Sequence, residues 1–413
     1  MSATHEALAG WLEPRHPEAV SFLAELVKVP SDTPPGDNAA HAERAAALLA
    51  GLGFEVERHP LPAAAVAEAG LKSVTNLVVR HRFGPGPTIA LNAHGDVVPP
   101  GDGWTHAPYG AQVDDGRMFG RGVAVSKSDF ATYAYALAAL RSLKPGILGG
   151  CVELHFTYDE EMGGDLGPRW LLANGITRPD FAICAGFSYG IVTAHNGCLQ
   201  LEVVLRGRSA HAAIPESGVD ALEAATTLLM ELYASRAQLA QTRSRVEGIT
   251  HPTLNVGRIE GGIHTNVVPD RVTLKIDRRI VPEEDASAVE RQLRGLMEAV
   301  ARRHPGISFE IRRLLLADPL RPLAGHERLV DAIGRNATAI FGQPITAGGV
   351  PLYTDARHYA SAGVPVVLYG AGPRSIEASN AKRADEHIVL EDLRKATLTV
   401  ACALADLLSE RTQ

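Results

Sequence analysis

The stretch Val152–Gly164 (VELHFTYDEEMGG) joins an apolar strand to two adjacent glutamates, Glu160 and Glu161. Its first five residues alternate in the manner of a buried strand. Two neighbouring carboxylates at the end of such a strand are unfavourable unless a cation or a proton lies nearby. A solvated turn with two glutamates is the alternative interpretation. The glycines that follow favour a ligand site at the carboxyl end of a sheet strand, because they let the backbone approach a ligand closely.

Strands and helices alternate on both sides of this stretch. Apolar periodicity predicts helices at 17–29, 39–52 and 127–143, and strands at 54–57, 76–80, 88–93 and 152–156. Turn chemistry predicts a loop at 30–36, which contains three prolines. Alternating strands and helices are typical of a mostly parallel sheet, so the predicted fold class is α/β.

The pattern changes near residue 195. Strands are predicted at 199–205, 254–258, 272–277 and 307–315, with helices at 220–234 and 284–303. This order predicts an antiparallel sheet with helices on one face, a compact α+β insert. After it, a helix is predicted at 328–341, a buried strand at 365–369 and a closing helix at 390–408. The predicted domains are therefore 1–194 together with 316–413, and an inserted domain at 195–315.

Composition limits the functional classes. The chain has 413 residues and a net charge of −7, which argues against nucleic acid as a partner. No apolar run reaches the roughly 18 residues of a membrane helix, and the amino terminus lacks a signal-peptide pattern. The four cysteines form no CxxC pair, and Cys151, Cys184 and Cys402 have apolar neighbours typical of core thiols. We therefore expect a cytoplasmic protein with no membrane partner.

Three further short motifs are weak signals on their own. His94-Gly95-Asp96 follows a predicted core strand, where an imidazole can coordinate a metal while a carboxylate fixes its tautomer. His211, in SAHA (209–212), is predicted to open the first helix of the insert, where a histidine can meet an anion. Asp277-Arg278-Arg279 ends a predicted strand. Solvated side chains are the alternative interpretation for the last two.

Order and spacing make these motifs specific. Nine signals occur in sequence: NAHGDVVP (92–99), Trp104, GRG (120–122), TYDEEMGG (157–164), GRSAHAAIP (207–215), TNVVPD (265–270), DRRIVP (277–282), TDAR (354–357) and GAGP (370–373). From Val20 to Leu408 the chain resembles the family of acetylornithine deacetylase, succinyl-diaminopimelate desuccinylase, carboxypeptidase G and aminoacylase. The resemblance implies a mostly parallel-sheet catalytic domain built from both ends of the chain. It also implies an inserted α+β lid domain through which the protein forms a homodimer.

The resemblance also implies roles for individual residues. Members of this family hold two zinc ions bridged by an aspartate and a water. His94 matches the histidine ligand of the first zinc, and Asp96 matches its orienting carboxylate. Glu160 matches the general base and Glu161 the glutamate ligand of the second zinc. His211 matches the lid histidine that reaches a partner's site to stabilise an oxyanion. Binding of a small substrate that carries a carboxylate falls to Arg279, Asn266 and Asp355.

Three of the five metal-ligand positions depart from the family pattern. Val125 stands where GRGxxD places the bridging aspartate, and Gly186 or Phe187 stands where an acid is expected. Lys382 stands where AHxxDE places a histidine. Rescue by Asp129 or His387 would need a register shift that the flanking motifs do not support.

We therefore expect no metal and no other cofactor, with zinc as the alternative. Lys382 would supply a fixed positive charge beside Glu160 and Glu161, and would act as an acid or base if burial lowered its pKa. The leading hypothesis is metal-independent acid/base chemistry on an amino-acid-like or N-acyl amino acid substrate, such as epimerisation, isomerisation, elimination, or amide condensation or cyclisation. The alternatives are a metal-dependent amidohydrolase and a non-catalytic binding protein. Specificity is assigned to loops at 187–197, 261–266 and 348–358.

Overall fold

The structure, a computed structural model, describes residues 2–409 and divides into two compact units. Of the described residues, the first unit comprises 2–193, 322–348 and 354–409, and the second comprises 194–321 and 349–353. The second unit thus extends six residues beyond the insert expected from the sequence, which ended at 315, and it gains a short returning segment.

The helices and strands of the described residues have the following bounds. The helices are α1 (Ala3–Leu12), α2 (His16–Val27), α3 (Ala39–Gly51), α4 (Ala63–Glu68), α5 (Ser128–Arg141), α6 (Pro168–Ala173), α7 (Ala221–Leu239), α8 (Ala286–Arg303), α9 (His326–Phe341), α10 (Ala356–Ser361) and α11 (Leu390–Ser409). The strands are β1 (Val56–Pro60), β2 (Thr75–Arg82), β3 (Thr88–His94), β4 (Gln112–Asp114), β5 (Arg117–Phe119), β6 (Cys151–Thr157), β7 (Phe181–Cys184), β8 (Ile191–His195), β9 (Gly197–Arg206), β10 (Thr253–Gly261), β11 (Arg271–Ile280), β12 (Ser308–Ala317), β13 (Ala347–Val350), β14 (Val366–Leu368) and β15 (His387–Val389).

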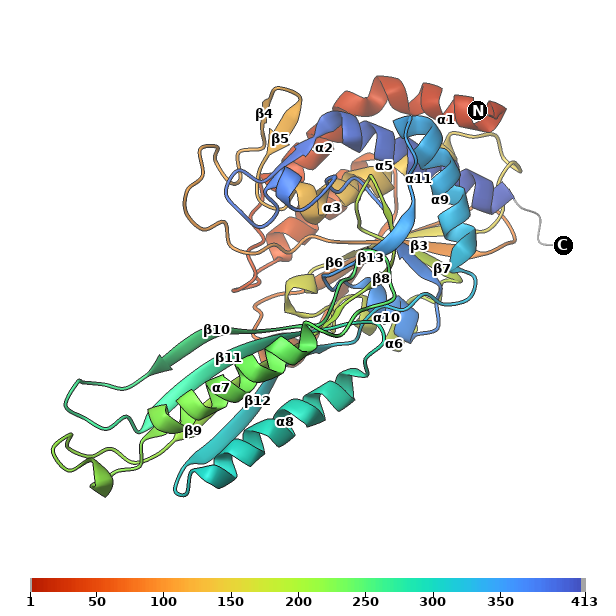
Figure 1. Ribbon diagram of the computed structural model, residues 1–413. Coiled ribbons are helices and arrows are strands. Elements are labelled where there is room, and N and C mark those ends of the chain that lie inside the picture. Colours follow the sequence, from red (N-terminus) through yellow and green to blue (C-terminus); the bar gives the residue numbers. More distant parts are fainter. Residues whose placement is uncertain (1, 410–413) are drawn as a thin grey trace. The chain divides into compact units, whose positions relative to one another are not determined.

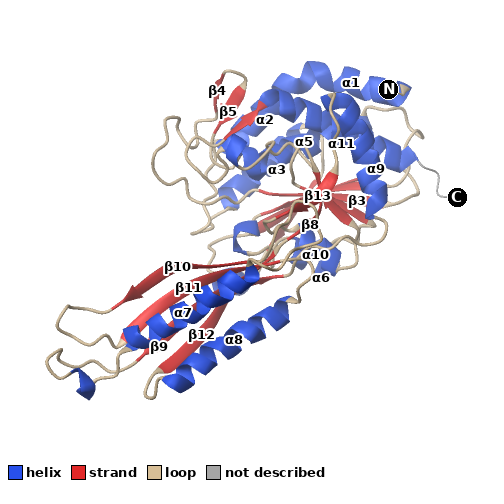
Figure 2. Ribbon diagram, in the orientation of Figure 1, coloured by secondary structure: helices blue, strands red, loops and turns tan. Residues whose placement is uncertain are grey.

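The first unit is built on an eight-stranded sheet of order β1-β2-β6-β3-β7-β14-β8-β13. The four central strands, β6, β3, β7 and β14, run parallel, whereas β1, β2 and β8 pair antiparallel with their neighbours. Figures 1 and 2 show α2, α5, α9 and α11 on one side of this sheet and α6 and α10 on the other. Helices on both faces explain why the central strands are apolar on both sides. The α/β prediction is confirmed.

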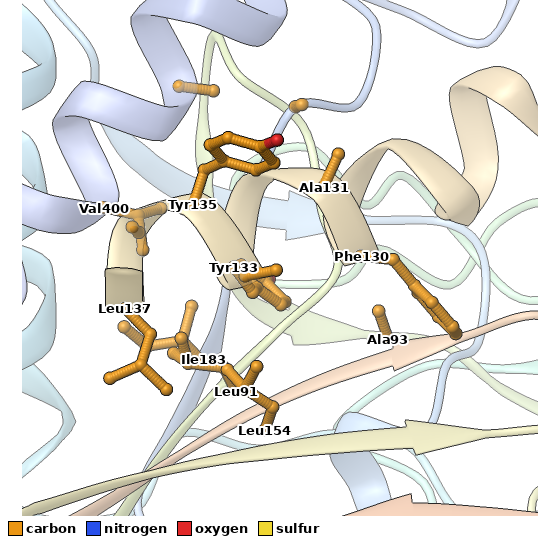
Figure 3. Close-up of a cluster of buried hydrophobic side chains, with 14 of the residues drawn as sticks. Leu91, Ala93, Phe130, Ala131, Tyr133, Tyr135, Leu137, Leu154, Ile183 and Val400 are labelled. Atoms are coloured by element: carbon orange, nitrogen blue, oxygen red, sulfur yellow. The ribbon is translucent and has the colours of Figure 1, made fainter. Parts of the chain in front are cut away.

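Helix α5 forms the centre of the core. Every residue from Ser128 to Leu140 is buried, because the sheet covers one side of α5 and α2 and α11 cover the other. Figure 3 shows Tyr133 and Leu137 of α5 above Leu91, Leu154 and Ile183, which come from three adjacent strands. A helix that is buried all round needs small and apolar residues on every face, and the sequence SDFATYAYALAALR supplies them.

The second unit is a four-stranded antiparallel sheet of order β10-β11-β9-β12. Leu199, Leu201 and Val203 alternate along β9 and are buried against the helices α7 and α8. Asp220 and Asp285 accept amide hydrogen bonds at the starts of these helices, which fixes where each begins. The predicted α+β insert is confirmed.

Several predictions of local structure were wrong. Residues 187–197 and 348–358 are not simply loops, because β8, the end of β13 and the start of α10 lie within them. His211 does not open a helix: α7 begins ten residues later, at Ala221. Helix α1 and the strand pair β4–β5 were missed, because α1 buries only Leu8 and Leu12 and each of these strands has three residues. All four cysteines are free and buried, which confirms the core positions predicted for Cys151, Cys184 and Cys402.

Candidate active site

Two parallel strand ends carry the candidate site. β3 and β6 are neighbours, and His94 at the end of β3 lies opposite Thr157 at the end of β6. The chain then turns at Asp159 into a short helical turn, Glu160–Met162. Parallel strands end at the same edge of a sheet. His94-Gly95-Asp96 and Asp159-Glu160-Glu161 therefore lie close together at that edge.

Asp96 organises this turn. Its side chain is fully buried, and its two carboxylate oxygens accept hydrogen bonds from the amides of Glu160 (3.3 Å) and Glu161 (2.9 Å). Its backbone carbonyl accepts a hydrogen bond of 2.9 Å from Nδ1 of His94, while its carboxylate lies 3.4 Å from the same nitrogen. Asp96 therefore fixes both the ring orientation of His94 and the direction of the two glutamates.

His94 and Glu160 face each other across the site, with Nε2 of His94 3.8 Å from Oε2 of Glu160. Burial lowers the pKa of His94, but the carboxylates of Glu160, Asp96 and Glu161 outweigh burial and raise that pKa to about 10. Burial also raises the pKa of Glu160, and the nearby Glu161 raises it further, while His94 and Lys382 oppose this. The pair thus places a proton donor beside a carboxylate of increased basicity.

Lys382 lies beside the second glutamate. Its Nζ donates a hydrogen bond of 2.6 Å to Oε2 of Glu161, so the ion pair predicted from the sequence is present. The lysine side chain is 54% exposed, whereas that of Glu161 is 8% exposed. Burial lowers the pKa of Lys382, but Glu161 and Glu160 outweigh it and hold the pKa above its usual value. The condition under which Lys382 would act as an acid or base, a pKa lowered by burial, is therefore not met.

Val125 and Gly186 occupy tightly constrained backbone. Ser126, next to Val125, accepts a hydrogen bond at Oγ from the amide of His94 and donates one to its carbonyl, which holds this segment against β3. A Cβ added at Gly186 would lie 2.7 Å from the backbone nitrogen of Tyr369 and 2.8 Å from the carbonyl carbon of Leu368. Position 186 therefore has no room for a side chain. Among residues 2–409, no three His, Cys, Asp or Glu side chains converge in an arrangement suited to a metal ion.

Two buried acids lie behind the site. Asp355 is 5% exposed, and its Oδ2 accepts a long hydrogen bond of 3.5 Å from the hydroxyl of Thr157. Burial, and then the charge of Glu160, raise its pKa to about 8. Asp129 accepts a hydrogen bond of 2.7 Å from the amide of Ala371, and burial raises its pKa to about 7. The assignment of Asp355 to substrate binding stays a prediction, and its burial places it under the site.

Sequence reasoning missed Arg121 and Glu386. Nη1 of Arg121 lies 2.6 Å from Oε2 of Glu386, and both side chains are 2% exposed. Both residues lie in motifs that the sequence analysis used: Arg121 is the middle residue of GRG, and Glu386 ends the AKRADE segment. Neither motif shows that the two side chains form an ion pair.

The remaining predicted residues lie in the second unit. His211 is exposed in a loop, and its Nδ1 accepts a hydrogen bond of 3.0 Å from the amide of Ala213. That bond places the proton of the neutral ring on Nε2, which is the arrangement a donor to an oxyanion needs. Asn266 is exposed nearby and pairs with His264. Arg279 is half-buried, with Nε 2.9 Å from Oδ1 of Asp277. The structure thus brings His94, Asp96, Glu160, Glu161 and Lys382 together in the first unit. His211, Asn266 and Arg279 belong to the second unit.

Comparison with known proteins now identifies the family. The model of peptidase family M20/M25/M40 matches residues 90–406, about three quarters of the chain. The chain belongs to this family. Within residues 2–409 of this M20-family chain, no helix is long and apolar enough to cross a membrane.

Individual relatives agree with this assignment. Succinyl-diaminopimelate desuccinylase of Gluconobacter oxydans is 32% identical over 209 residues, which cover 48% of this chain and 51% of the relative. Acetylornithine deacetylase of Pectobacterium carotovorum is 30% identical over 287 residues, which cover 68% of this chain and 70% of the relative. The matched segment thus spans about half of the Gluconobacter protein. The M20 metallo-carboxypeptidase Sso-CP2 of Sulfolobus solfataricus has the same fold, with a TM-score of 0.76 at 20% identity, covering 95% of this chain and 99% of that one.

Proposed function

We propose that this M20-family chain is a metal-independent acid/base enzyme acting on a small amino-acid-like substrate that carries a carboxylate. Glu160 is the residue that takes up and returns a proton, and His94 is the facing donor. Lys382 supplies the positive charge that the second metal ion supplies in the family. Asp96 fixes the positions of His94, Glu160 and Glu161 through its hydrogen bonds with them.

The observation that carries the proposal is the ion pair between Lys382 and Glu161. An ammonium 2.6 Å from Oε2 of Glu161 uses the carboxylate that the resemblance assigns to a zinc ion. An ammonium has no lone pair to offer a metal ion and repels any cation nearby. Glu161 is therefore neutralised by a residue of this chain.

The other positions fit zinc poorly. Catalytic zinc sites normally have three protein ligands from histidine, cysteine or carboxylate side chains. Val125 offers an apolar side chain. The next position is either Gly186, which has no room for any side chain, or Phe187, which is apolar. Only His94 and Glu161 remain at ligand positions, one for each of the two metals implied by the resemblance. This set does not fit a di-zinc centre.

The arrangement suits proton transfer close to a carbonyl or carboxylate group. A carboxylate such as Glu160 removes a proton best when its pKa has been raised toward neutrality, as burial does here. The negative charge that develops on the substrate is stabilised by fixed positive groups, and Lys382 and His94 both face the glutamate pair. Epimerisation, isomerisation, elimination and amide condensation or cyclisation share this requirement.

Solvent exchange reports proton transfer whatever the product is, and it therefore tests the proposal. A panel of amino acids and N-acyl amino acids is incubated with the protein in D₂O, with and without chelator, and exchange or conversion is followed by NMR. We expect turnover that survives chelation and falls at least about 100-fold in Glu160→Gln. Asp165→Asn, an exposed acid paired with Arg169, is the matched control and keeps full turnover. Unchanged turnover in Glu160→Gln, or turnover that requires stoichiometric zinc, contradicts the proposal.

A metal-dependent amidohydrolase is the second candidate, and the names of the relatives favour it. A desuccinylase, a deacetylase and a metallo-carboxypeptidase all match this chain. This candidate predicts that protein prepared in zinc retains the metal and cleaves N-succinyl or N-acetyl amino acids, and that chelation abolishes cleavage. Binding of such compounds without turnover, and with no effect of Glu160→Gln, favours a receptor instead.

A further inference from the structure

The loop that carries Lys382 has an unusual backbone. Asn380, Lys382 and Asp385 have φ angles of 52°, 62° and 54°, the left-handed region that residues other than glycine rarely adopt. Three such residues within six positions are unfavourable unless neighbouring groups hold them in place. The contacts of this loop therefore show what holds Lys382.

One anchor lies at Asp385. Its carboxylate accepts hydrogen bonds from the amide of Thr105 (2.9 Å), the hydroxyl of Thr105 (2.8 Å) and the amide of His106 (3.1 Å). This anchor ties the outer end of the loop to the segment that follows Trp104. The hydrogen bonds of this carboxylate go to Thr105 and His106 and not to Lys382.

The second anchor, Glu386, reaches Lys382 directly. Its Oε2 accepts a hydrogen bond of 3.4 Å from the amide of Lys382 and lies 2.6 Å from Nη1 of Arg121. Its Oε1 accepts a bond of 3.2 Å from the amide of Ala124, and its carbonyl accepts one of 2.9 Å from the amide of Gly120. One buried carboxylate thus joins the Lys382 backbone to the turn that leads into Val125.

Arg121 is held equally firmly. Its Nη2 donates a hydrogen bond of 3.0 Å to the carbonyl of Pro100, and its guanidinium lies 5.2 Å from the ring centre of Trp104. A buried ion pair is a poor source of net stability, because desolvation offsets most of its attraction. Its better-attested use is to specify one arrangement of the chain.

We infer that Glu386, oriented by Arg121, is the positioning residue for Lys382: it holds the lysine backbone where the ammonium reaches Glu161. Its consequence for turnover rests on the proposed function, whereas the positioning itself is a property of the free protein. Glu386 touches no reacting atom and acts only through Lys382.

Competitive acylation of lysines, read by mass spectrometry without substrate, tests the positioning. An ammonium bound to Glu161 is a poor nucleophile, so Lys382 should label slowly in the native protein. In Glu386→Gln its labelling should rise several-fold, because an amine that no longer contacts the Glu161 carboxylate is more accessible to the acylating reagent. The labelling of Lys28 and Lys395 should not change. Arg121→Lys, which keeps the charge but loses the planar fork, gives a smaller rise and serves if Glu386→Gln fails to fold.

Glu153→Gln is the matched control, because Glu153 is also a buried acid paired with an arginine, Arg80, at 2.9 Å. Lys382 labelling should stay unchanged in this variant. Unchanged labelling in folded Glu386→Gln and Arg121→Lys, or an equal rise in Glu153→Gln, overturns the inference. A double-mutant cycle that measures turnover adds a second readout. Glu386→Gln should lower the turnover of the native protein but should have little further effect on the turnover of Lys382→Met. If Lys382→Met leaves turnover unchanged, the proposed function fails while the labelling still decides the positioning.

Discussion

Lys382 and Glu161 lie 221 residues apart in the sequence, yet Nζ of one is 2.6 Å from Oε2 of the other. The pair joins the loop after GAGP to the turn after β6. It neutralises one of two adjacent carboxylates and leaves Glu160 facing His94. The two glutamates therefore differ in their partners: Glu161 is paired with an ammonium, whereas Glu160 faces His94 and is the proton carrier that we propose.

Loss of the cation at position 382 should reduce turnover. Lys382→Met leaves Glu161 uncompensated beside Glu160, and we expect kcat/KM to fall roughly 10- to 100-fold. Lys382→Arg keeps the charge and should retain part of the activity. Lys28→Met is the matched control, because Lys28 forms an exposed pair with Glu25 at 2.8 Å. Equal activity of Lys382→Met and the native protein would show that the cation has no role.

A side chain at position 186 should destabilise the fold. The Cβ of Gly186→Ala would lie within 2.8 Å of backbone atoms of Leu368 and Tyr369, so β7 and β14 must separate. We expect a loss of about 1–3 kcal/mol in the free energy of unfolding, measured by denaturant titration. Gly190→Ala is the control, since its nearest neighbour, the Thr346 carbonyl oxygen, is 3.9 Å away. Native stability in Gly186→Ala would mean that position 186 accepts a side chain after all.

Glu153 should make stability depend on acid pH. Burial raises its pKa, but His155, Thr177 and Arg80 outweigh burial and lower it to about 2. The unfolded state, with a pKa near 4.5, therefore binds more protons than the folded state between these values. The stabilisation is fully present above pH 4.5, is lost as pH falls toward 2, and is on the order of 3 kcal/mol.

Denaturant titrations of native protein and Glu153→Gln from pH 7 downward measure this effect. The difference in unfolding free energy should be largest at neutral pH and should shrink below pH 4.5. A difference that stays constant with pH would assign the effect of the substitution to packing.

Helix α7 should take part in a homodimer, as the family resemblance implies for the inserted domain. It exposes Leu222, Met230 and Tyr233, with Met230 70% exposed, and these residues fall along one side of the helix. We expect a dimeric mass for the native protein by light scattering and a shift toward the monomer in Met230→Glu. Val113→Glu, at an exposed residue of β4 in the first unit, should leave the mass unchanged. A monomeric native protein would contradict this prediction.

Most of the helices and strands follow from the sequence alone, and so does the list of candidate site residues. Periodicity is a local property, so the strand at 152–156, the helix at 127–143 and the order of the inserted unit could be read directly. Short strands such as β4, β5 and β7 carry too few residues for a pattern, and only their neighbours in the sheet define them. Val125 and Lys382 stood out because the surrounding motifs fixed their places, whereas the third position could be either Gly186 or Phe187.

How those residues act depends on the tertiary structure. A pKa depends on burial and on charges that lie far away in sequence, so the raised values of His94, Glu160 and Lys382 appear only once β3, β6 and the 380–386 loop meet. The same holds for Gly186, whose lack of space comes from β14, and for Glu386, whose partner Arg121 lies 265 residues earlier. The spacing of the motifs identifies the candidate residues. Contacts between distant parts of the chain determine their protonation, the space around them and the groups they touch.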